Sequence, residues 1–380
     1  GFGATAVALF DYVTGSVTGL ALTGSGSGYA PGDTLAVRLV GGGGPTNVLG
    51  AATLGELASG ALTKQGAGTL ALTGNNAYTG GTTIAAGTLV VGAGGTAGTL
   101  SPGPVANDGL LVYHRSDDTA WNQPITGTGT LEKRGVGVLT LGGANGYSGG
   151  TRILNGRVVL GANDALGSGW LTLGGSEAAG ALSLSNVSQT VNGAMRVESA
   201  LADDVNRLHI GAGQSLVVLG SVTSGPIAAG SITKFVADGA GTWAVTNAGG
   251  MFQIGGVTGD VGYIADVDLS ALGTLSVDLG AGTFRVGSTS GGSGNATNVL
   301  RLATNSTIVA ARIGVGDQTS KFTGPNILTL GAGETRLYTD SLMIAGGKSD
   351  SRMLFDGATG TLTVSNLAGT GRANLAVGVN

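Results

Sequence analysis

The chain has 380 residues, a formal net charge of −4 and no cysteine. The missing cysteines exclude disulfides and thiolate metal sites, and the small net charge argues against nucleic acid as a partner. Glycine is abundant, at 76 residues, but does not recur at every third position, which excludes collagen. Because 42% of the residues are hydrophobic and net charge is low, the chain is also unlike a disordered protein. This mixture favours many short strands joined by tight turns.

Residues 1–60 form the least repetitive part of the chain. The glycine-rich runs at 24–28 and 41–44 are typical of loops. We expect a less regular, β-rich N-terminal segment here, which serves as a cap or as the first coils.

No run of about 18 apolar residues occurs anywhere in the 380 residues, so membrane insertion of the given chain is not expected.

Two segments, 62–92 and 131–161, repeat one another without a gap, and 16 of their 31 positions are identical. Constant apolar positions alternate with variable polar ones, as expected of strands that bury one face of a coil. The predicted core residues are Leu70, Leu72, Ile84, Leu139, Leu141 and Ile153. The predicted turn residues, where glycine reaches a positive φ without a Cβ clash, are Gly66, Gly68, Gly80, Gly81, Gly135, Gly137, Gly149 and Gly150.

Lys64 and Lys133 occupy the same position of the repeat. Strict alternation from Leu62 places both side chains inward, which is unusual for a charged residue. A turn at this position, with the amine reaching outward to solvent, is the simplest interpretation.

The two copies resemble the passenger-associated β-strand repeat of bacterial autotransporters. The resemblance rests on the order and spacing of G-A-G-T-L-A-L-T at 66–73, N-x-Y-T-G-G-T-T-I at 76–84 and A-G-T-L-V-V-G at 86–92, and it directly covers about a sixth of the chain. It implies an all-β protein, an elongated right-handed parallel β-helix (a β-solenoid), located outside the bacterial cell or on its surface. The family has no shared catalytic residues to carry over.

Shorter echoes of the G-A-G element at 211–213, 239–241, 280–282 and 331–333 indicate that strands continue along the chain. We therefore expect one continuous β-solenoid over residues 61–380, with about 20–25 residues in each coil. Only the stretch from Met195 to Ile210 is rich enough in charged residues and leucine to be considered as a helix, and strands are favoured there as well. The final residues alternate as one more strand would, and they show no membrane-barrel pattern, which indicates a passenger segment or a relative anchored in another way.

Two short motifs match catalytic or binding signatures by chance. The G-x-S-x-G match at 146–150 lies inside the repeat, where the first copy has Thr79 in place of Ser148, so a turn is the preferred interpretation. The segment 347–349 ends like a phosphate-binding loop, but Leu342 stands where the first glycine is required. No cofactor and no metal site is predicted.

The charged residues offer a few further candidates. His114 and His209 are far apart in the sequence, and each is expected at the surface or in a turn. Adjacent acids on a strand point to opposite faces, so Asp117–Asp118 and Asp203–Asp204 are poorly placed for acid/base catalysis and are expected in solvated loops. The densest polar and aromatic cluster is Tyr113, His114, Arg115, Asp117, Asp118 and Trp121. It is compatible with a sugar-contacting loop, although a long loop that leaves a coil without binding anything is preferred.

Three functions are consistent with these observations. The first is a structural building block of a surface stalk, sheath or filament that associates with itself, end to end or laterally, because no charged or proline-bearing cap follows Arg372. The second is an adhesin passenger that binds a surface or a glycan through loops such as 111–122. The third, a polysaccharide-degrading β-helix enzyme, lacks clustered acids, and we expect the chain not to be an enzyme.

Overall fold

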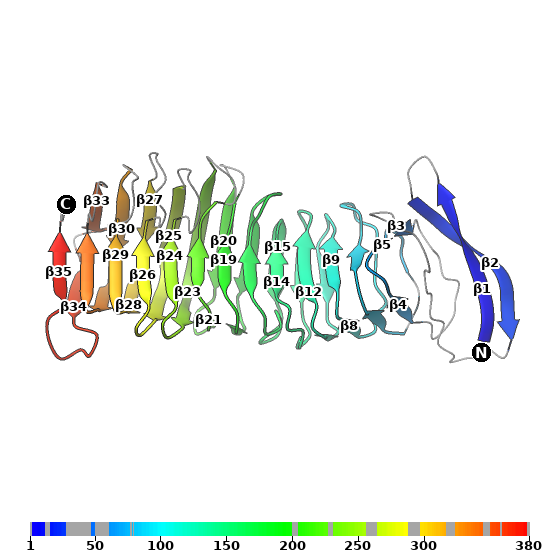
Figure 1. Ribbon diagram of the computed structural model, residues 1–380, viewed down its shortest axis with the longest axis horizontal. Coiled ribbons are helices and arrows are strands. Elements are labelled where there is room, and N and C mark those ends of the chain that lie inside the picture. The colour runs from blue at the N-terminus through cyan, green and yellow to red at the C-terminus, as the bar shows by residue number, and fades with distance from the viewer. Residues whose placement is uncertain are drawn as a thin grey trace. The chain divides into compact units, whose positions relative to one another are not determined.

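The computed structural model describes residues 2–11, 16–27, 47–49, 61–76, 78, 80–199, 204–226, 231–255, 264–287, 297–316, 324–344, 350–357 and 359–377. Within these residues the regular structure consists of β-strands alone. The chain divides into two compact units, Gly1–Arg152 with Ala165–Gly167, and Ile153–Asp164 with Ser168–Asn380. In both units short strands stack in parallel, coil upon coil, which is the architecture of a parallel β-helix (Figure 1).

Each coil of the first unit has up to three faces. The first face is a parallel sheet of β4 (Leu62–Lys64), β6 (Thr82–Ile84), β8 (Val105–Asn107) and β11 (Ile125–Thr126). The second face contains β3 (Asn47–Leu49), β5 (Thr69–Leu72), β7 (Thr88–Val91), β9 (Leu110–His114) and β12 (Thr130–Arg134). The third face contains β10 (Thr119–Trp121) and β13 (Val138–Leu141). An antiparallel hairpin of β1 (Phe2–Asp11) and β2 (Ser16–Ser27) joins the second face through β3.

The two repeat copies lie at different corners of the coil, so the repeat sequence specifies a turn between two strands and not a position in one particular sheet. Leu62 lies on the first face, and three register steps, to Thr82, Val105 and Ile125, lead to the same face three coils later. Leu131, its counterpart in the second copy, lies one corner further, on the second face. The same sequence therefore turns the chain from the first face to the second in one copy, and from the second face to the third in the other.

The second unit contains two long parallel sheets, and β14 (Thr151–Ile153) spans the boundary between the units. We call one the front sheet; its strands are β16 (Leu171–Leu173), β19 (Met195–Val197), β22 (Val222–Ser224), β24 (Met251–Ile254), β26 (Thr283–Val286), β29 (Arg312–Val315), β32 (Ser341–Ile344) and β35 (Asn374–Val377). The back sheet contains β15 (Gly156–Leu160), β17 (Gly180–Leu184), β20 (Val205–Ile210), β23 (Ile232–Thr246), β25 (Ile264–Asp278), β27 (Asn298–Arg301), β30 (Asn326–Leu330) and β33 (Ser351–Phe355). Further strands pair within the back sheet, namely β18 (Gln189–Val191), β21 (Ser215–Val218), β28 (Asn305–Val309), β31 (Glu334–Tyr338) and β34 (Thr361–Ser365). The region from Met195 to Ile210 thus begins and ends in strands, as expected.

Coil length differs between the units. On the second face of the first unit, Thr88 pairs with Thr69 of the preceding coil and with Leu110 of the following one, so a coil there takes about 20 residues, the short end of the range for repeat units. On the front sheet, Ser341 pairs with Asn374, and such a coil takes more than about 30 residues, still within that range. The expected coil of about 20–25 residues is therefore wrong for most of the second unit. Successive strands of the front and back sheets are also far apart in the sequence, for example Ile254 and Ile264, or Val286 and Asn298, which accounts for much of the difference. Added length between strands carries only a small entropic cost.

Aromatic rings fill the interior of the second unit where its coils are long. Phe235, Trp243, Phe252 and Phe284 are all buried. Phe252 and Phe284 are register partners on adjacent coils, and their rings stack with centroids 4.9 Å apart and planes at 10°. The indole of Trp243 lies 5.8 Å from the rings of both Phe235 and Phe252. Each such pair contributes about 0.5–1.5 kcal/mol beyond the burial of its area.

Glycine meets two different needs at the corners. Gly66 and Gly135 have φ angles of 73° and 71°, in the left-handed region. Gly137 has no such φ, but a Cβ on it would lie 2.1 Å from the carbonyl oxygen of Asp117 in the preceding coil. Close approach between coils, and not only a tight turn, therefore requires glycine at these corners.

The predicted core residues lie between these corners, and all six are buried: Leu70, Leu72, Ile84, Leu139, Leu141 and Ile153.

A buried hydroxyl without a hydrogen-bond partner allows a stability test of the columns of side chains that point into the interior of the coils. Thr335 in β31 is fully buried between Ser306 and Leu362 of the adjacent coils, and its Oγ1 has no hydrogen-bond partner. We expect Thr335→Val to raise the free energy of unfolding by about 1 kcal/mol, because it removes an unsatisfied polar group at nearly constant volume. Urea unfolding followed by circular dichroism measures this change. The outward Thr307→Val should alter the free energy by less than about 0.5 kcal/mol, and destabilisation by Thr335→Val would contradict the description of this column.

Candidate functional site

The polar and aromatic cluster at 111–122 is built on two strands and a corner. β9 ends at His114, residues 115–118 turn the corner, and β10 begins at Thr119. β9 pairs in register with β7 and β12, and β10 pairs with β13. The expectation of a long loop is therefore wrong, because a short corner joins two strands of the stack.

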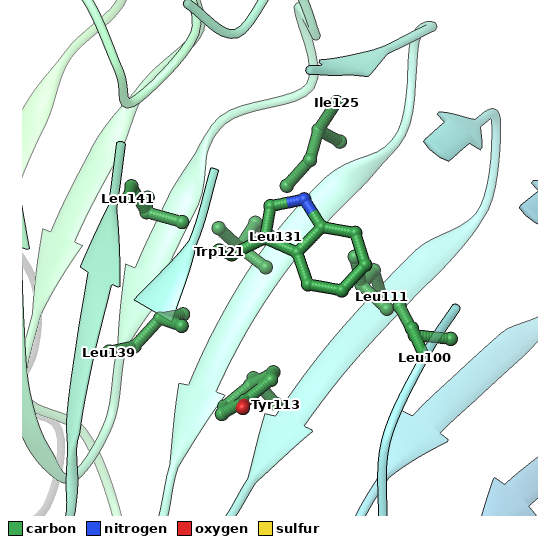
Figure 2. A pocket seen from close by; sticks show the side chains of 8 residues that line it. All are labelled: Leu100, Leu111, Tyr113, Trp121, Ile125, Leu131, Leu139 and Leu141. Carbon is green, nitrogen blue, oxygen red and sulfur yellow. The ribbon is translucent and has the colours of Figure 1, made fainter. Parts of the chain in front are cut away.

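Tyr113 and Trp121 of this cluster line the interior of the coil. Figure 2 shows both rings beside a small cavity whose other lining residues are aliphatic: Leu100, Leu111, Ile125, Leu131, Leu139 and Leu141. The Tyr113 hydroxyl donates to Thr119 Oγ1 at 2.7 Å, and burial raises the pKa of Tyr113. The indole nitrogen of Trp121 is buried and has no partner. The cavity has a volume of about 10 Å³, the lower limit for one water molecule, so it does not admit a sugar between these rings and the aliphatic side chains.

The Arg115 side chain binds the backbone of the preceding coil. Its guanidinium donates to the carbonyl oxygens of Thr96 and Gly98. It also donates to both carboxylate oxygens of Asp117, at 2.8 and 2.7 Å, and this hydrogen bonding lowers the pKa of Asp117. The arginine is buried, so the pair closes the corner and leaves little cationic surface.

Carboxylate and amide side chains at the corners cap the following coil. Asp118 Oδ1 accepts from the backbone N–H of Val138 at 2.9 Å in the first unit, and Asp164 Oδ1 accepts from Thr190 at 2.8 Å in the second. The same contact joins Asp108 to Thr128, Asn163 to Ser188, and Asp340 to Leu367. The partners are 20 to 27 residues apart, which is one coil. These side chains satisfy backbone donors that the strands leave unpaired.

The amine of Lys64 does not reach outward. The residue is 5% exposed, and its Nζ donates to the carbonyl oxygens of Gln65 and Gly66 at 2.9 and 2.6 Å. A third hydrogen bond, at 3.0 Å, reaches the carbonyl oxygen of Ala86 in the next coil. The expectation of an amine in solvent is wrong because the turn directs its own carbonyl oxygens toward the lysine.

Lys133 repeats this arrangement in the second copy. It is 1% exposed, and its Nζ donates to the carbonyl oxygens of Arg134 and Gly135 at 2.7 and 2.6 Å. Burial lowers the pKa of Lys133 to about 8, although the nearby Asp118 carboxylate acts in the opposite direction. The amine is therefore still charged at neutral pH, inside a shell of backbone oxygens.

His209 lies on the outward side of β20, as expected. Its Nδ1 is 2.5 Å from Asp238 Oδ1, and the two residues are register partners on adjacent coils. Ser183 is the register partner on the other side, so serine, histidine and aspartate follow one another across three coils. The Ser183 hydroxyl is 3.2 Å from that of Ser185, and this column of the described strands does not include the serine–histidine bond of a catalytic triad.

The G-x-S-x-G match is a corner, as expected. Tyr147 is fully buried with its hydroxyl 2.5 Å from Thr151 Oγ1, whereas Ser148 is exposed. A nucleophile elbow leads into a helix, and here the chain continues into β14. The segment 347–349 and Asp203 lie outside the described residues, and Asp204 is half-buried just before β20.

Neither a metal site nor a membrane-spanning helix is present in the described part of the chain. It contains no group of three or more histidine, aspartate or glutamate residues placed to hold a metal ion. No helix among the described residues is long and apolar enough to cross a membrane.

The titration of Lys133 tests the burial of its amine. Because the folded-state pKa of about 8 lies below the unfolded value of 10.5, folding favours the neutral amine, and this group adds stability as the pH rises from about 8 to 10.5. We expect nuclear magnetic resonance of labelled lysine side chains to show one amine that titrates near pH 8 and disappears in Lys133→Met. Titration of the Lys133 amine at 10.5 would contradict a buried position.

Comparisons with known proteins confirm that the two copies resemble the autotransporter passenger repeat. The family model of the passenger-associated-transport-repeat matches residues 62–91 and 131–160. The adhesin BmaC autotransporter of Brucella suis biovar 1 (strain 1330) is 52% identical over 56 residues, which are 15% of this chain and 2% of that protein. The similarity therefore spans a small part of both chains, and no solved structure matches. The two segments that match the passenger-associated-transport-repeat model fold as corners of a parallel β-helix.

Proposed function

We propose that this chain is a structural stalk within an adhesin-like autotransporter passenger, located outside the bacterial cell or on its surface. The observation that carries the proposal is the use of its polar side chains. Asp108, Asp118 and Asp164 bond to backbone donors one coil further on, and Arg115 bonds to carbonyl oxygens one coil back. These four side chains are engaged in contacts between coils and not directed to a ligand, which supports a structural role.

An enzymatic role has no comparable support in the described residues. The adjacent acids Asp117 and Asp118 serve different contacts, one with Arg115 and the other with Val138. His209 pairs with Asp238 on an open sheet surface, where both side chains are more than two-fifths exposed. Acid/base catalysis on a sugar needs two carboxyl groups across one bond, and these residues do not provide them.

Attachment assays distinguish a stalk from an adhesin. Beads coated with the full chain should bind neither a glycan array nor host-cell and matrix surfaces above background. The same beads should bind normally when an unrelated binding domain is fused to the chain. Attachment by the unfused chain would contradict the stalk proposal.

The alternative to a stalk is an adhesin that binds through residues 111–122, which belong to the stack itself. Deleting this segment would remove β9 and β10 and disrupt the stack, so loss of binding by a deletion would be uninformative. His114→Ala alters a half-exposed side chain of the cluster without removing a strand. If the chain attaches to a surface or glycan, attachment that is lost in this variant and kept in His209→Ala would favour the adhesin.

Self-association is a second proposal, and one observation supports it. In the coil formed by β33, β34 and β35, Phe355 and Leu375 are 48% and 65% exposed, whereas their register partners Leu330 and Leu342 are 1% and 3% exposed. A further coil would bury these side chains and pair with the outer edges of these strands, whether it comes from chain that follows residue 380 or from a second copy. For the 380-residue chain on its own, we propose the second copy.

We expect sedimentation velocity to show assembly that increases with concentration. Leu375→Lys should abolish it, because the substitution places a charge in the interface. Leu219→Lys changes an exposed leucine after β21 and serves as the control. A monomeric wild-type chain at high concentration would contradict self-association.

A further inference from the structure

Three corners of the first unit share one chemical arrangement: a buried cation surrounded by backbone carbonyl oxygens. The cations are Lys64, Arg115 and Lys133, all at most 6% exposed. Lys64 lies between the first and second faces, and the other two lie between the second and third faces on successive coils. Each cation bonds to two or three main-chain oxygens, and at Lys64 and Arg115 these oxygens include ones from a neighbouring coil.

The geometry around the two lysines is that of a site for a small monovalent cation. The distances from Nζ to the carbonyl oxygens are 2.6 to 3.0 Å, within the range of charged hydrogen bonds. Neutral carbonyl oxygens that converge on one point replace the hydration shell of a cation such as potassium. The oxygens belong to the main chain, so the site does not depend on any other side chain.

An echo of the repeat without the lysine folds differently. At 239–241 the G-A-G element recurs, but Ala237 stands at the lysine position. The chain does not turn a closed corner there, since β23 continues from Ile232 to Thr246 with a register shift between Gly239 and Thr242. At the other echoes, 211–213, 280–282 and 331–333, the chain leaves one strand and enters the next with His209, Asp278 and Thr329 at the lysine position, so a corner can form without the lysine. The buried cation therefore distinguishes the two repeat copies from all four echoes.

We propose that the corner of each passenger-associated-transport-repeat copy is a carbonyl-lined binding site for a monovalent cation, and that the ammonium of the repeat's own lysine occupies it. The lysine is in this sense a tethered ligand. Its ammonium donates hydrogen bonds to carbonyl oxygens that the turn directs into the coil. At Lys64 one of these bonds joins the coil to the next one through the carbonyl oxygen of Ala86. The cage should therefore accept a free cation of similar size when the side chain is removed.

Chemical rescue of Lys64→Ala in the full chain tests this proposal. The variant should unfold at a lower temperature than wild type, and methylammonium, ammonium or potassium chloride should restore part of the loss at constant ionic strength. Tetramethylammonium, which is too large for the cage, should not. Lys64→Met keeps the stem and fills the cage, so it should be destabilised without rescue, whereas Lys234→Ala on the outward side of β23 should respond as wild type does.

An equal response of all variants to all four cations would overturn the proposal. If Lys64→Ala does not fold, the wild-type chain still provides a test. Acetylation with an amine reagent, read by mass spectrometry, should modify Lys64 and Lys133 much more slowly than Lys234 in the folded chain and at similar rates after unfolding. Equal rates in the folded chain would place the amines in solvent and also exclude the cation site. Neither readout depends on whether the chain is a stalk or an adhesin.

Discussion

The structure depends on register between coils. Among the described strands, those inside a sheet form main-chain hydrogen bonds with strands of the coils before and after them, and each corner must return the chain to the same register. This requirement explains the aliphatic columns inside, the glycines whose Cβ would strike the carbonyl of an adjacent coil, and the corner carboxylates that accept from the next coil's N–H groups. A main-chain group that misses its partner in the interior is costly, so side chains are recruited where strands end.

This recruitment has a consequence for function. The most promising cluster for ligand binding, at 111–122, has its tyrosine and tryptophan rings beside an internal cavity (Figure 2). Its arginine is bonded to backbone oxygens. These contacts between coils support the spacer role proposed above. The matched segment is similar to part of an autotransporter adhesin, which supports a location outside the cell or on its surface.

Much of the fold could be predicted from alternation alone. Leu70, Leu139 and Ile153 could be assigned to the core because an apolar residue at every second position has one physical meaning in a strand. Alternation could not predict what Lys64 and Lys133 bind, because it describes strands and not the direction of carbonyl groups at a corner. Composition also could not separate a short corner from a loop at 115–118, since both are rich in polar residues. The lengths of the later coils depend on connections that carry no periodic signal.

The most direct test of the account is the solvent exposure of Tyr113, the residue at which the surface-site and internal-corner interpretations differ most. Hydroxyl-radical footprinting, normalised to the unfolded chain, should give Tyr113 a protection close to that of the buried Tyr147 and far above that of the exposed Phe355. Protection of Tyr113 as low as that of Phe355 would place the cluster on the surface and contradict the internal role assigned to it.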